Sequence, residues 1–318
     1  MSDSGILLES AACHAVTGKL VHKLDPDEAF LTMWRRTGPD TFSVTAHWPA
    51  DRPFYRSADG GFDSLLLTET VRQLFPLISH VGYDTPFECH LVWENYRYDL
   101  DPALLRAGSG PVALELRVTC SDLVRRRTGL AGMTMDVDVL RGGIRLATAT
   151  SRFTVQAPAI YRRLRGANFD RVCAMASAPP APEGIPAPLA GRSDQADVVL
   201  SEIPHVDVPE QIASEMSGLL GPNSDSWWLR VDITHRTYFD HPVDHVPGAL
   251  LLEAARQAAQ ALWYPVPALP LTMSAAFHRY VDLDAPCRIT ARVESPALAR
   301  VTAEQYDRLC FTSEVGTA

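Results

Sequence analysis

The stretch LLLTETVRQ at residues 65–73 has a counterpart in the second half of the chain, ALLLEAARQ at residues 249–257. Self-similarity at a fixed offset indicates an internal duplication. Each copy places a carboxylate, a guanidinium and an amide inside an apolar run, where a purely structural helix has no need of them. The matching pairs, at 253 − 69 = 256 − 72 = 257 − 73 = 184, are Glu69 and Glu253, Arg72 and Arg256, and Gln73 and Gln257.

Each copy is predicted to be a central helix followed by antiparallel strands. Helices are expected near 64–80 and 249–263, the second of them after the polar loop 239–248. Downstream stretches such as 133–139 alternate with period two, as in a sheet with one solvated face. A curved sheet wrapped around each apolar helix buries it in so short a unit. The predicted fold class is therefore α+β, with two long central helices each wrapped by an antiparallel sheet.

The proline- and alanine-rich segment 176–194 is predicted to be a linker. It divides the chain into a first domain, 1–175, which includes an N-terminal leader, and a second domain, 195–318. Because the two units are covalently joined, we expect a dimer-like arrangement within one chain. That pseudo-dimer is expected to be monomeric or to pair as a homodimer.

The composition argues against several classes of function. A net charge of −9 argues against a nucleic-acid-binding surface. The apolar runs are far shorter than the ~20 residues that cross a bilayer, and no signal-peptide pattern opens the sequence, so a cytoplasmic location is expected. The six cysteines are scattered without metal-ligand spacing, so we expect reduced thiols and no metal site.

Several separate motifs together resemble the A-factor synthase (AfsA-type) family, whose members are tandem hotdog proteins. The loop and helix from His241 to Gln257 are also similar to the H…PG…LxxExxxQ stretch of β-hydroxyacyl-carrier-protein dehydratases. The catalytic histidine of those dehydratases lies further upstream, where this chain has Phe239. The motifs that follow the order of the AfsA-type family are Val21-His22-Lys23, Glu69 through Gln73, Arg152-Phe153-Thr154, Tyr161 through Gly166, Phe239 through Gly248, and Phe277 through Tyr280.

The resemblance implies a tandem hotdog fold and an acyltransferase. A β-ketoacyl group moves from an acyl-carrier-protein thioester to the hydroxyl of dihydroxyacetone phosphate, giving a precursor of γ-butyrolactone, butenolide or furan signalling molecules. The implied partners are the acyl-carrier protein and dihydroxyacetone phosphate. No cofactor is implied, because the substrate itself carries the phosphopantetheine. Two alternatives stay open: a hotdog thioesterase or dehydratase acting on carrier-protein or coenzyme A thioesters, and a non-catalytic acyl-binding protein.

The helix glutamates Glu69 and Glu253 are candidate catalytic bases, because transfer to an alcohol requires removal of the hydroxyl proton. A carboxylate on an apolar helix is desolvated, so we expect the pKa of each to be raised towards neutrality. The alternative is a structural carboxylate that the helix dipole or a cap stabilises.

The arginines and glutamines of the two helices are candidate substrate-binding residues. Arg72 and Arg256 follow the glutamates at i+3 and can hold a phosphate by bidentate hydrogen bonds. The alternative is an ion pair with the glutamate of the same helix. Gln73 and Gln257 follow at i+4 and are expected to orient the glutamate or to bind the acyl carbonyl, unless they bond to backbone.

The loop before the second helix contributes further candidates. His241 and His245 are candidate catalytic residues, and Asp240 is a candidate substrate-binding residue unless it only forms a turn. Gly248 offers its amide at the N-terminus of the helix, where backbone N–H groups can stabilise the oxyanion of a thioester.

Hotdog sites lie between two subunits, so a crossed arrangement is predicted. The working site is expected to pair the loop 240–248 with helix residues 69–73. The second, pseudo-symmetric site is expected to pair the loop 59–64 with helix residues 253–257. The arginine run 125–127 is predicted to be a solvated hairpin tip; the alternative is a contact with an acidic carrier protein.

Overall fold

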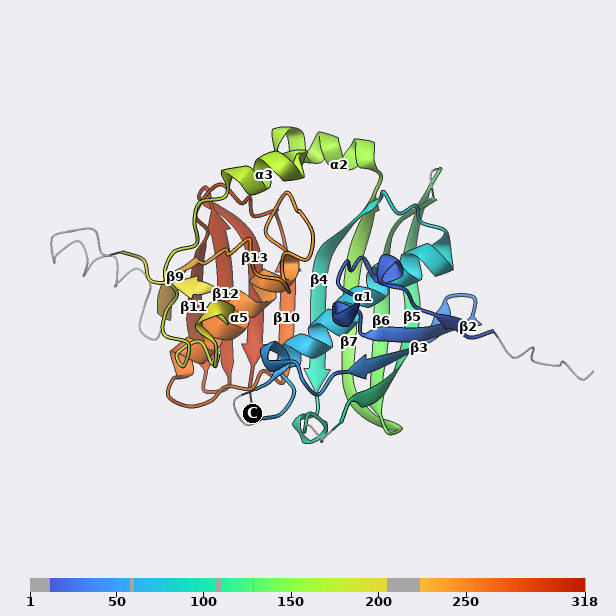
Figure 1. Ribbon diagram of the computed structural model, residues 1–318, viewed down its shortest axis with the longest axis horizontal. Helices are drawn as coiled ribbons and strands as arrows, with labels where there is room; N and C mark the ends of the chain where they lie inside the picture. Colours follow the sequence, from blue (N-terminus) through green and yellow to red (C-terminus); the bar gives the residue numbers. More distant parts are fainter. Residues whose placement is uncertain (1–11, 58–59, 107–109, 128, 205–223, 318) are drawn as a thin grey trace, which may run out of the picture.

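The two halves of the chain share one continuous antiparallel sheet (Figure 1). The computed structural model describes residues 12–57, 60–106, 110–127, 129–204 and 224–317. In these residues thirteen strands follow the order β1-β2-β3-β5-β6-β7-β4-β10-β13-β12-β11-β9-β8. In the first half the strands are β1 His14–Ala15, β2 Leu31–Gly38, β3 Thr41–Trp48, β4 His90–Leu100, β5 Val112–Arg126, β6 Gly129–Arg141 and β7 Ile144–Gln156. In the second half they are β8 Leu200–Ser201, β9 Ser224–Leu229, β10 Thr272–Phe277, β11 Arg288–Ser295, β12 Leu298–Gln305 and β13 Arg308–Gly316.

Strands β4 and β10 form the seam between the halves. They pair antiparallel, from Thr272 opposite Asp99 to Ala276 opposite Asn95. Helices α1 (Ser64–Tyr83) and α5 (Gly248–Trp263) lie across the same side of the sheet, one over each half (Figure 1). The chain therefore contains both halves of the predicted pseudo-dimer.

Helix α1 is buried on nearly all sides. Asp63 caps its N-terminus, where the side-chain Oδ1 accepts a hydrogen bond from the Leu65 amide at 2.8 Å. Leucines along the helix, such as Leu66 and Leu74, are fully buried, and each contributes about 1.5–3 kcal/mol to folding. Polar residues of α1 are buried with them, so they require partners. None of the helices in the described part of the chain has the length and apolarity needed to cross a membrane.

A short helical segment connects the halves across the top of the molecule (Figure 1). It comprises α2 (Pro158–Arg165), the 3-10 turn η5 (Gly166–Phe169) and α3 (Arg171–Ser177), and we call residues 158–177 the strap. The residues of the predicted linker that follow the strap are mostly irregular but pack tightly, with Ala190 fully buried. The predicted linker therefore begins in the last turn of α3, and its later residues join the core of the second half. The predicted domain bounds stay a prediction.

Candidate active site between the two halves

Glu69 lies at the centre of a buried cluster on α1. Its carboxylate accepts hydrogen bonds from Arg72 Nε and Nη2, both at 2.8 Å, and from Gln73 Nε2 at 2.9 Å. Lys23 reaches in from the N-terminal segment and places Nζ 3.1 Å from Glu69 Oε1. The spacing i, i+3, i+4 therefore brings the three helix residues together, as predicted.

Glu253 repeats this arrangement on α5. Its carboxylate accepts hydrogen bonds from Arg256 Nε and Nη2, both at 2.7 Å, and from Gln257 Nε2 at 2.6 Å. Arg192 takes the place of the lysine, with Nε 2.7 Å from Glu253 Oε1. In both copies the arginine forms the intrahelical ion pair that was the alternative to a free phosphate ligand.

Each of the two glutamines forms hydrogen bonds with the backbone of a segment that lies before its helix in the sequence. Gln73 Oε1 accepts the Phe30 amide at 2.9 Å, and its Nε2 donates to the Glu28 carbonyl at 2.7 Å. These bonds and the one to glutamate use both N–H donors of the amide. Gln257 forms the equivalent bonds, with the Val199 amide at 2.9 Å and the Asp197 carbonyl at 2.8 Å. These partners lie 169 positions after the partners of Gln73 (199 − 30 = 197 − 28 = 169).

Asp63 closes the second cluster from the opposite half. Its Oδ2 lies 3.4 Å from Arg192 Nη1 and 3.9 Å from Arg256 Nε. The residue 184 positions later is the uncharged Pro247, which caps α5. The first cluster thus has no carboxylate at the position equivalent to Asp63, and the Arg72 side chain is 25% exposed, against 6% for Arg256. The first copy is open, and the second is closed.

Both helix glutamates are held ionised. Burial alone raises the pKa of Glu69, but Arg72 and Lys23 outweigh it and lower that pKa to about 2. The pKa of Glu253 is lowered to about 2 in the same way by its two arginines. The expectation of pKa values near neutrality is wrong, because each carboxylate lies between two cations. The second cation comes from outside the helix motif.

Asp240 links the loop before α5 to the first half of the chain. Its carboxylate accepts the backbone amides of Leu24 at 2.8 Å and Asp25 at 3.0 Å, next to Lys23. His241 Nδ1 lies 3.5 Å from Asp240 Oδ2, and its side chain is 41% exposed. Burial lowers the pKa of His241 although Asp240 opposes this, so its ring is neutral at neutral pH.

The two loops therefore face the clusters crosswise. The loop with Asp240 meets the segment that carries Lys23, and Asp63 meets Arg256. This is the crossed geometry that the sequence predicts, with His241 on the side of α1. Asp59, which the same prediction includes, lies outside the described residues.

Asp244 and His245 belong to a network that anchors the strap. Asp244 accepts hydrogen bonds from Tyr161 Oη at 2.6 Å, Arg165 Nε at 3.0 Å and His245 Nδ1 at 2.8 Å. Arg165 Nη2 also donates to Asp282 at 2.7 Å. Burial raises the pKa of Asp244, but these donors hold it well below its usual range. The catalytic role of His245 stays a prediction.

Gly248, the first residue of α5, packs on the seam. A Cβ at this position would lie 2.8 Å from Trp93 Cε3 and 3.2 Å from Phe277 Cε1. Close packing alone therefore requires glycine here. The oxyanion role of its amide stays a prediction.

His22 adds an imidazole to the open cluster, oriented by a second histidine. Its Nε2 lies 2.8 Å from His80 Nε2, and His80 Nδ1 lies 2.6 Å from the Thr85 carbonyl oxygen. A carbonyl only accepts, so neutral His80 is protonated at Nδ1 and accepts the His22 Nε2–H. Burial, followed by the charges of His80 and Arg72, lowers the pKa of His22 to about 4. The neutral ring therefore presents an unprotonated Nδ1.

His22 also differs from its counterpart in the other half. It adopts a left-handed backbone conformation with φ of 55°, and Gly191, 169 positions later, has φ of 65°. A Cβ on Gly191 would lie 2.8 Å from Gln260 Cγ, and the residue of α1 that corresponds to Gln260 (260 − 184 = 76) is Pro76. Glycine suits the closed copy, whereas the open copy accepts about 1–2 kcal/mol of strain to hold an imidazole.

Comparison with known proteins identifies the family of the chain that has this crossed arrangement. The model of the A-factor biosynthesis hotdog domain (AfsA) matches residues 8–157 and 173–317. The chain belongs to the AfsA family. The resemblance seen in the motifs and the predicted tandem hotdog fold are thereby confirmed.

Relatives of this AfsA-family chain carry the name 2-oxo-3-(phosphooxy)propyl 3-oxoalkanoate synthase. The one from Streptomyces virginiae is 40% identical over 95% of this chain and 97% of its own length. The one from Streptomyces griseus is 36% identical, with 96% of both chains covered. A solved structure of an oleoyl thioesterase from Lactobacillus plantarum shares the fold, with a TM-score of 0.50 at 12% identity, covering 88% of this chain and 98% of that chain.

Sequence reasoning did not select three residues of the open cluster in this AfsA-family chain: His22, Lys23 and His80. The first two lie in a family motif, but their counterparts recur at offset 169 and not at 184, so the helix repeat does not reveal them. The usable signal for His80 was its position on α1, eleven residues after Glu69 (80 − 69 = 11), which is about three turns.

The buried glutamates predict the acid stability of this AfsA-family protein. Glu69 and Glu253 have folded-state pKa values of about 2, below those of the unfolded chain. Their stabilisation is therefore complete above about pH 4.5 and is lost as the pH falls towards 2. We expect the free energy of unfolding in urea to decrease steadily between pH 5 and pH 3. A free energy that stays constant over this interval contradicts the assignment.

Proposed function

We propose that this chain transfers a 3-oxoacyl group from a thioester to the free hydroxyl of dihydroxyacetone phosphate. The product is 2-oxo-3-(phosphooxy)propyl 3-oxoalkanoate, the compound in the names of its relatives. The observation that carries the proposal is the asymmetry of the two clusters. One is closed by Asp63, whereas the other combines two histidines, His22 and His241, with the partly exposed Arg72.

In this reaction the hydroxyl oxygen attacks the thioester carbonyl carbon. A carbon–oxygen bond forms, the carbon–sulfur bond breaks, and the hydroxyl proton ends on the released thiol. His22 Nδ1 accepts that proton and delivers it to the departing sulfur, because its Nε2–H is engaged with His80. His241 directs Nδ1–H to Asp240, so its Nε2 is a second acceptor for the substrate hydroxyl.

Arg72 is the proposed ligand of the phosphate. Glu69 holds its Nε and Nη2, and Nη1 has no hydrogen-bond partner among the described residues. A phosphate dianion bound here favours protonation of the neighbouring His22 and so raises the pKa of His22. Glu69 is then a positioning residue that fixes Lys23 and Arg72 rather than the base.

The test is the dependence of thiol release on the acceptor. A 3-oxoacyl thioester is incubated with the protein, with and without dihydroxyacetone phosphate, while free thiol and the mass of the products are followed. We expect thiol release to require the acceptor and to yield the phosphorylated ester. Unphosphorylated dihydroxyacetone is the control and should react more slowly.

The alternatives give different outcomes in this assay or in a parallel one with a 3-hydroxyacyl thioester. Thiol release that is independent of the acceptor and yields the free acid identifies a thioesterase. Loss of water from a 3-hydroxyacyl thioester identifies a dehydratase. Thioester consumption that never exceeds the uncatalysed rate identifies an acyl-binding protein. Each of these results contradicts the proposed transfer.

A further inference from the structure

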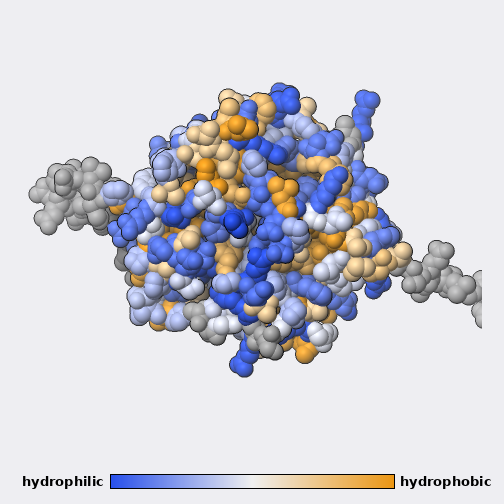
Figure 2. Space-filling view, in the orientation of Figure 1, coloured by the Kyte–Doolittle hydropathy of each residue, from blue (hydrophilic) through white to orange (hydrophobic). Residues whose placement is uncertain are grey.

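The outer face of the strap is apolar and exposed. Ile160, Arg163 and Leu164 lie at i, i+3 and i+4 of α2 and so share one face. Leu164 is 61% exposed, and Val172 at the start of α3 is 75% exposed. Figure 2 shows apolar residues beside hydrophilic ones over the top of the molecule, where Figure 1 places α2 and α3. Apolar side chains gathered in this way are typical of an interaction surface.

The same surface carries unpaired positive charge. Neither Arg162 nor Arg163 forms an ion pair with any residue that the structure describes, and Arg162 stacks over Phe169 with Cζ 5.3 Å from the ring centroid. The chain as a whole carries a net charge of −9, so this basic surface departs from the overall balance. Its charge complements an acidic partner.

The opposite face of the strap is fixed to the candidate active site. Tyr161 and Arg165 both bond to Asp244, which lies in the same loop as His241. These side chains are buried, and Arg165 is tied to the second half again through Asp282. The strap is therefore a platform that buried hydrogen bonds anchor to the loop of His241.

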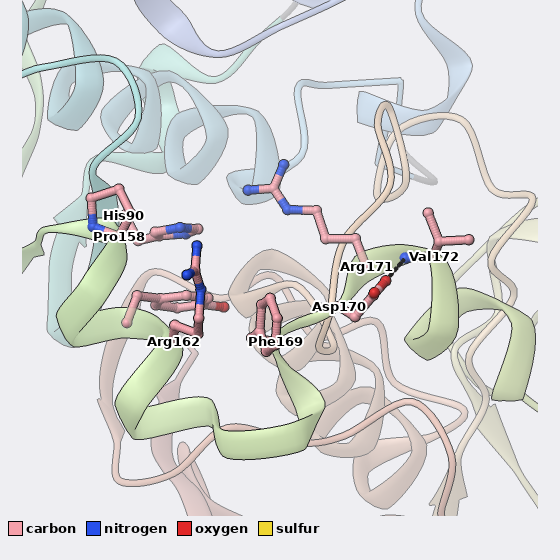
Figure 3. Close-up of a pocket in the computed structure, with 8 residues that line it drawn as sticks. His90, Pro158, Arg162, Phe169, Asp170, Arg171 and Val172 are labelled. Carbon is pink, nitrogen blue, oxygen red and sulfur yellow. Dashed lines mark hydrogen bonds between the residues drawn. The ribbon is translucent and has the colours of Figure 1, made fainter.

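A pocket of about 290 Å³ opens beside this platform. His90 stacks on Tyr161 in its wall, with 3.6 Å between ring centroids, and Arg171 extends from the start of α3 away from Phe169 (Figure 3). The charge of Arg171 acts on both His22 and His241. Arg171 therefore both lines this pocket and lies near enough to the proposed proton acceptors for its charge to act on them.

We propose that the strap is the docking surface for an acidic acyl-carrier protein, whose phosphopantetheine arm enters the site through this pocket. The inference rests on the proposed function, which requires a thioester donor. Arg162 and Arg163 meet acidic side chains of the carrier, Leu164 and Val172 pack against its apolar surface, and Arg171 binds the phosphodiester of the arm. The assignment favours the strap over the arginine run 125–127.

The test is a double charge reversal, Arg162→Glu with Arg163→Glu. The donors compared are a 3-oxoacyl thioester on a bacterial fatty-acid acyl-carrier protein and the same acyl group on N-acetylcysteamine, which has neither carrier nor phosphate. We expect kcat/KM for the carrier-bound donor to fall at least tenfold. The kcat/KM for the small thioester and the KM for dihydroxyacetone phosphate should stay within twofold. The matched control, Arg126→Glu with Arg127→Glu, changes the same charge elsewhere and should leave all three values within twofold.

Other outcomes overturn the docking proposal. An equal loss with both donors assigns the arginines to the reaction, and an increased KM for dihydroxyacetone phosphate assigns them to the acceptor. An equal loss in the control pair assigns the effect to overall charge, and no loss in the strap variant excludes this surface. Failure of the proposed function is distinguished by the unaltered protein, which then transfers the acyl group from neither donor. Titration of the loaded carrier into both variants still measures docking in that case.

Discussion

Replacing His22 with glycine is expected to reduce turnover by about 100- to 10,000-fold, the usual contribution of a positioned general base. Folding should be little affected, because Gly191 occupies the same left-handed position in the other half. The relay through His80 and Thr85 would lose the ring that it orients. The measurement is kcat for acyl transfer to dihydroxyacetone phosphate, together with the free energy of unfolding in urea.

Two further measurements separate a base from a packing residue. Added imidazole should restore part of the activity of His22→Gly, because the missing ring leaves a space of its own size beside Arg72. His22→Asn is the matched variant, since asparagine tolerates the left-handed conformation but supplies no base. A His22→Gly protein that retains turnover within twofold, or a loss that imidazole never restores while His22→Asn remains active, contradicts the role of His22.

Replacing Glu253 with glutamine is expected to destabilise the protein by about 3–5 kcal/mol, the cost of breaking a buried ion pair from one side. The side chains of Arg192 and Arg256 are 2% and 6% exposed. Without Glu253 they keep, among the residues that the structure describes, only Asp63 as a negative partner, at longer distances. The measurement is the midpoint and slope of urea unfolding. Activity is measured alongside it, without denaturant, at a temperature where the variant is folded.

Glu69→Gln is the matched control for this change, because the sequence context is the same but the copy is open. Arg72 is partly solvated, so the loss of stability should be smaller, whereas turnover should fall because Lys23 and Arg72 are no longer fixed. Equal destabilisation by the two substitutions contradicts a closed second copy. Intact turnover in Glu69→Gln together with a folded but inactive Glu253→Gln places the working site at α5.

The sequence was sufficient to predict side-chain contacts within one helix and the repetition of those contacts in the second copy. The spacing of Glu69, Arg72 and Gln73 predicts their shared face, and the repeat at 184 predicts that Glu253 has the same neighbours. Both relations depend only on helix geometry, and both are present.

Contacts between segments that lie far apart in the sequence were not predicted. The pKa of Glu69 is lowered first by Arg72 of its own helix and then by Lys23, which approaches from 46 positions earlier (69 − 23 = 46), so the helix spacing reveals only one of the two cations. The unprotonated Nδ1 of His22 depends on a left-handed backbone and on a carbonyl at Thr85. Such features require the assembled fold, because neither local propensity nor residue spacing determines them.

The two halves that β4 and β10 join into one sheet belong to a single polypeptide, and this has an evolutionary consequence. In an assembly of two identical subunits, any mutation changes both copies at once, so a histidine and a glycine cannot occupy equivalent positions. Fusion removes that constraint. One copy can then carry His22 where its twin carries Gly191, while the twin closes its cluster with Asp63.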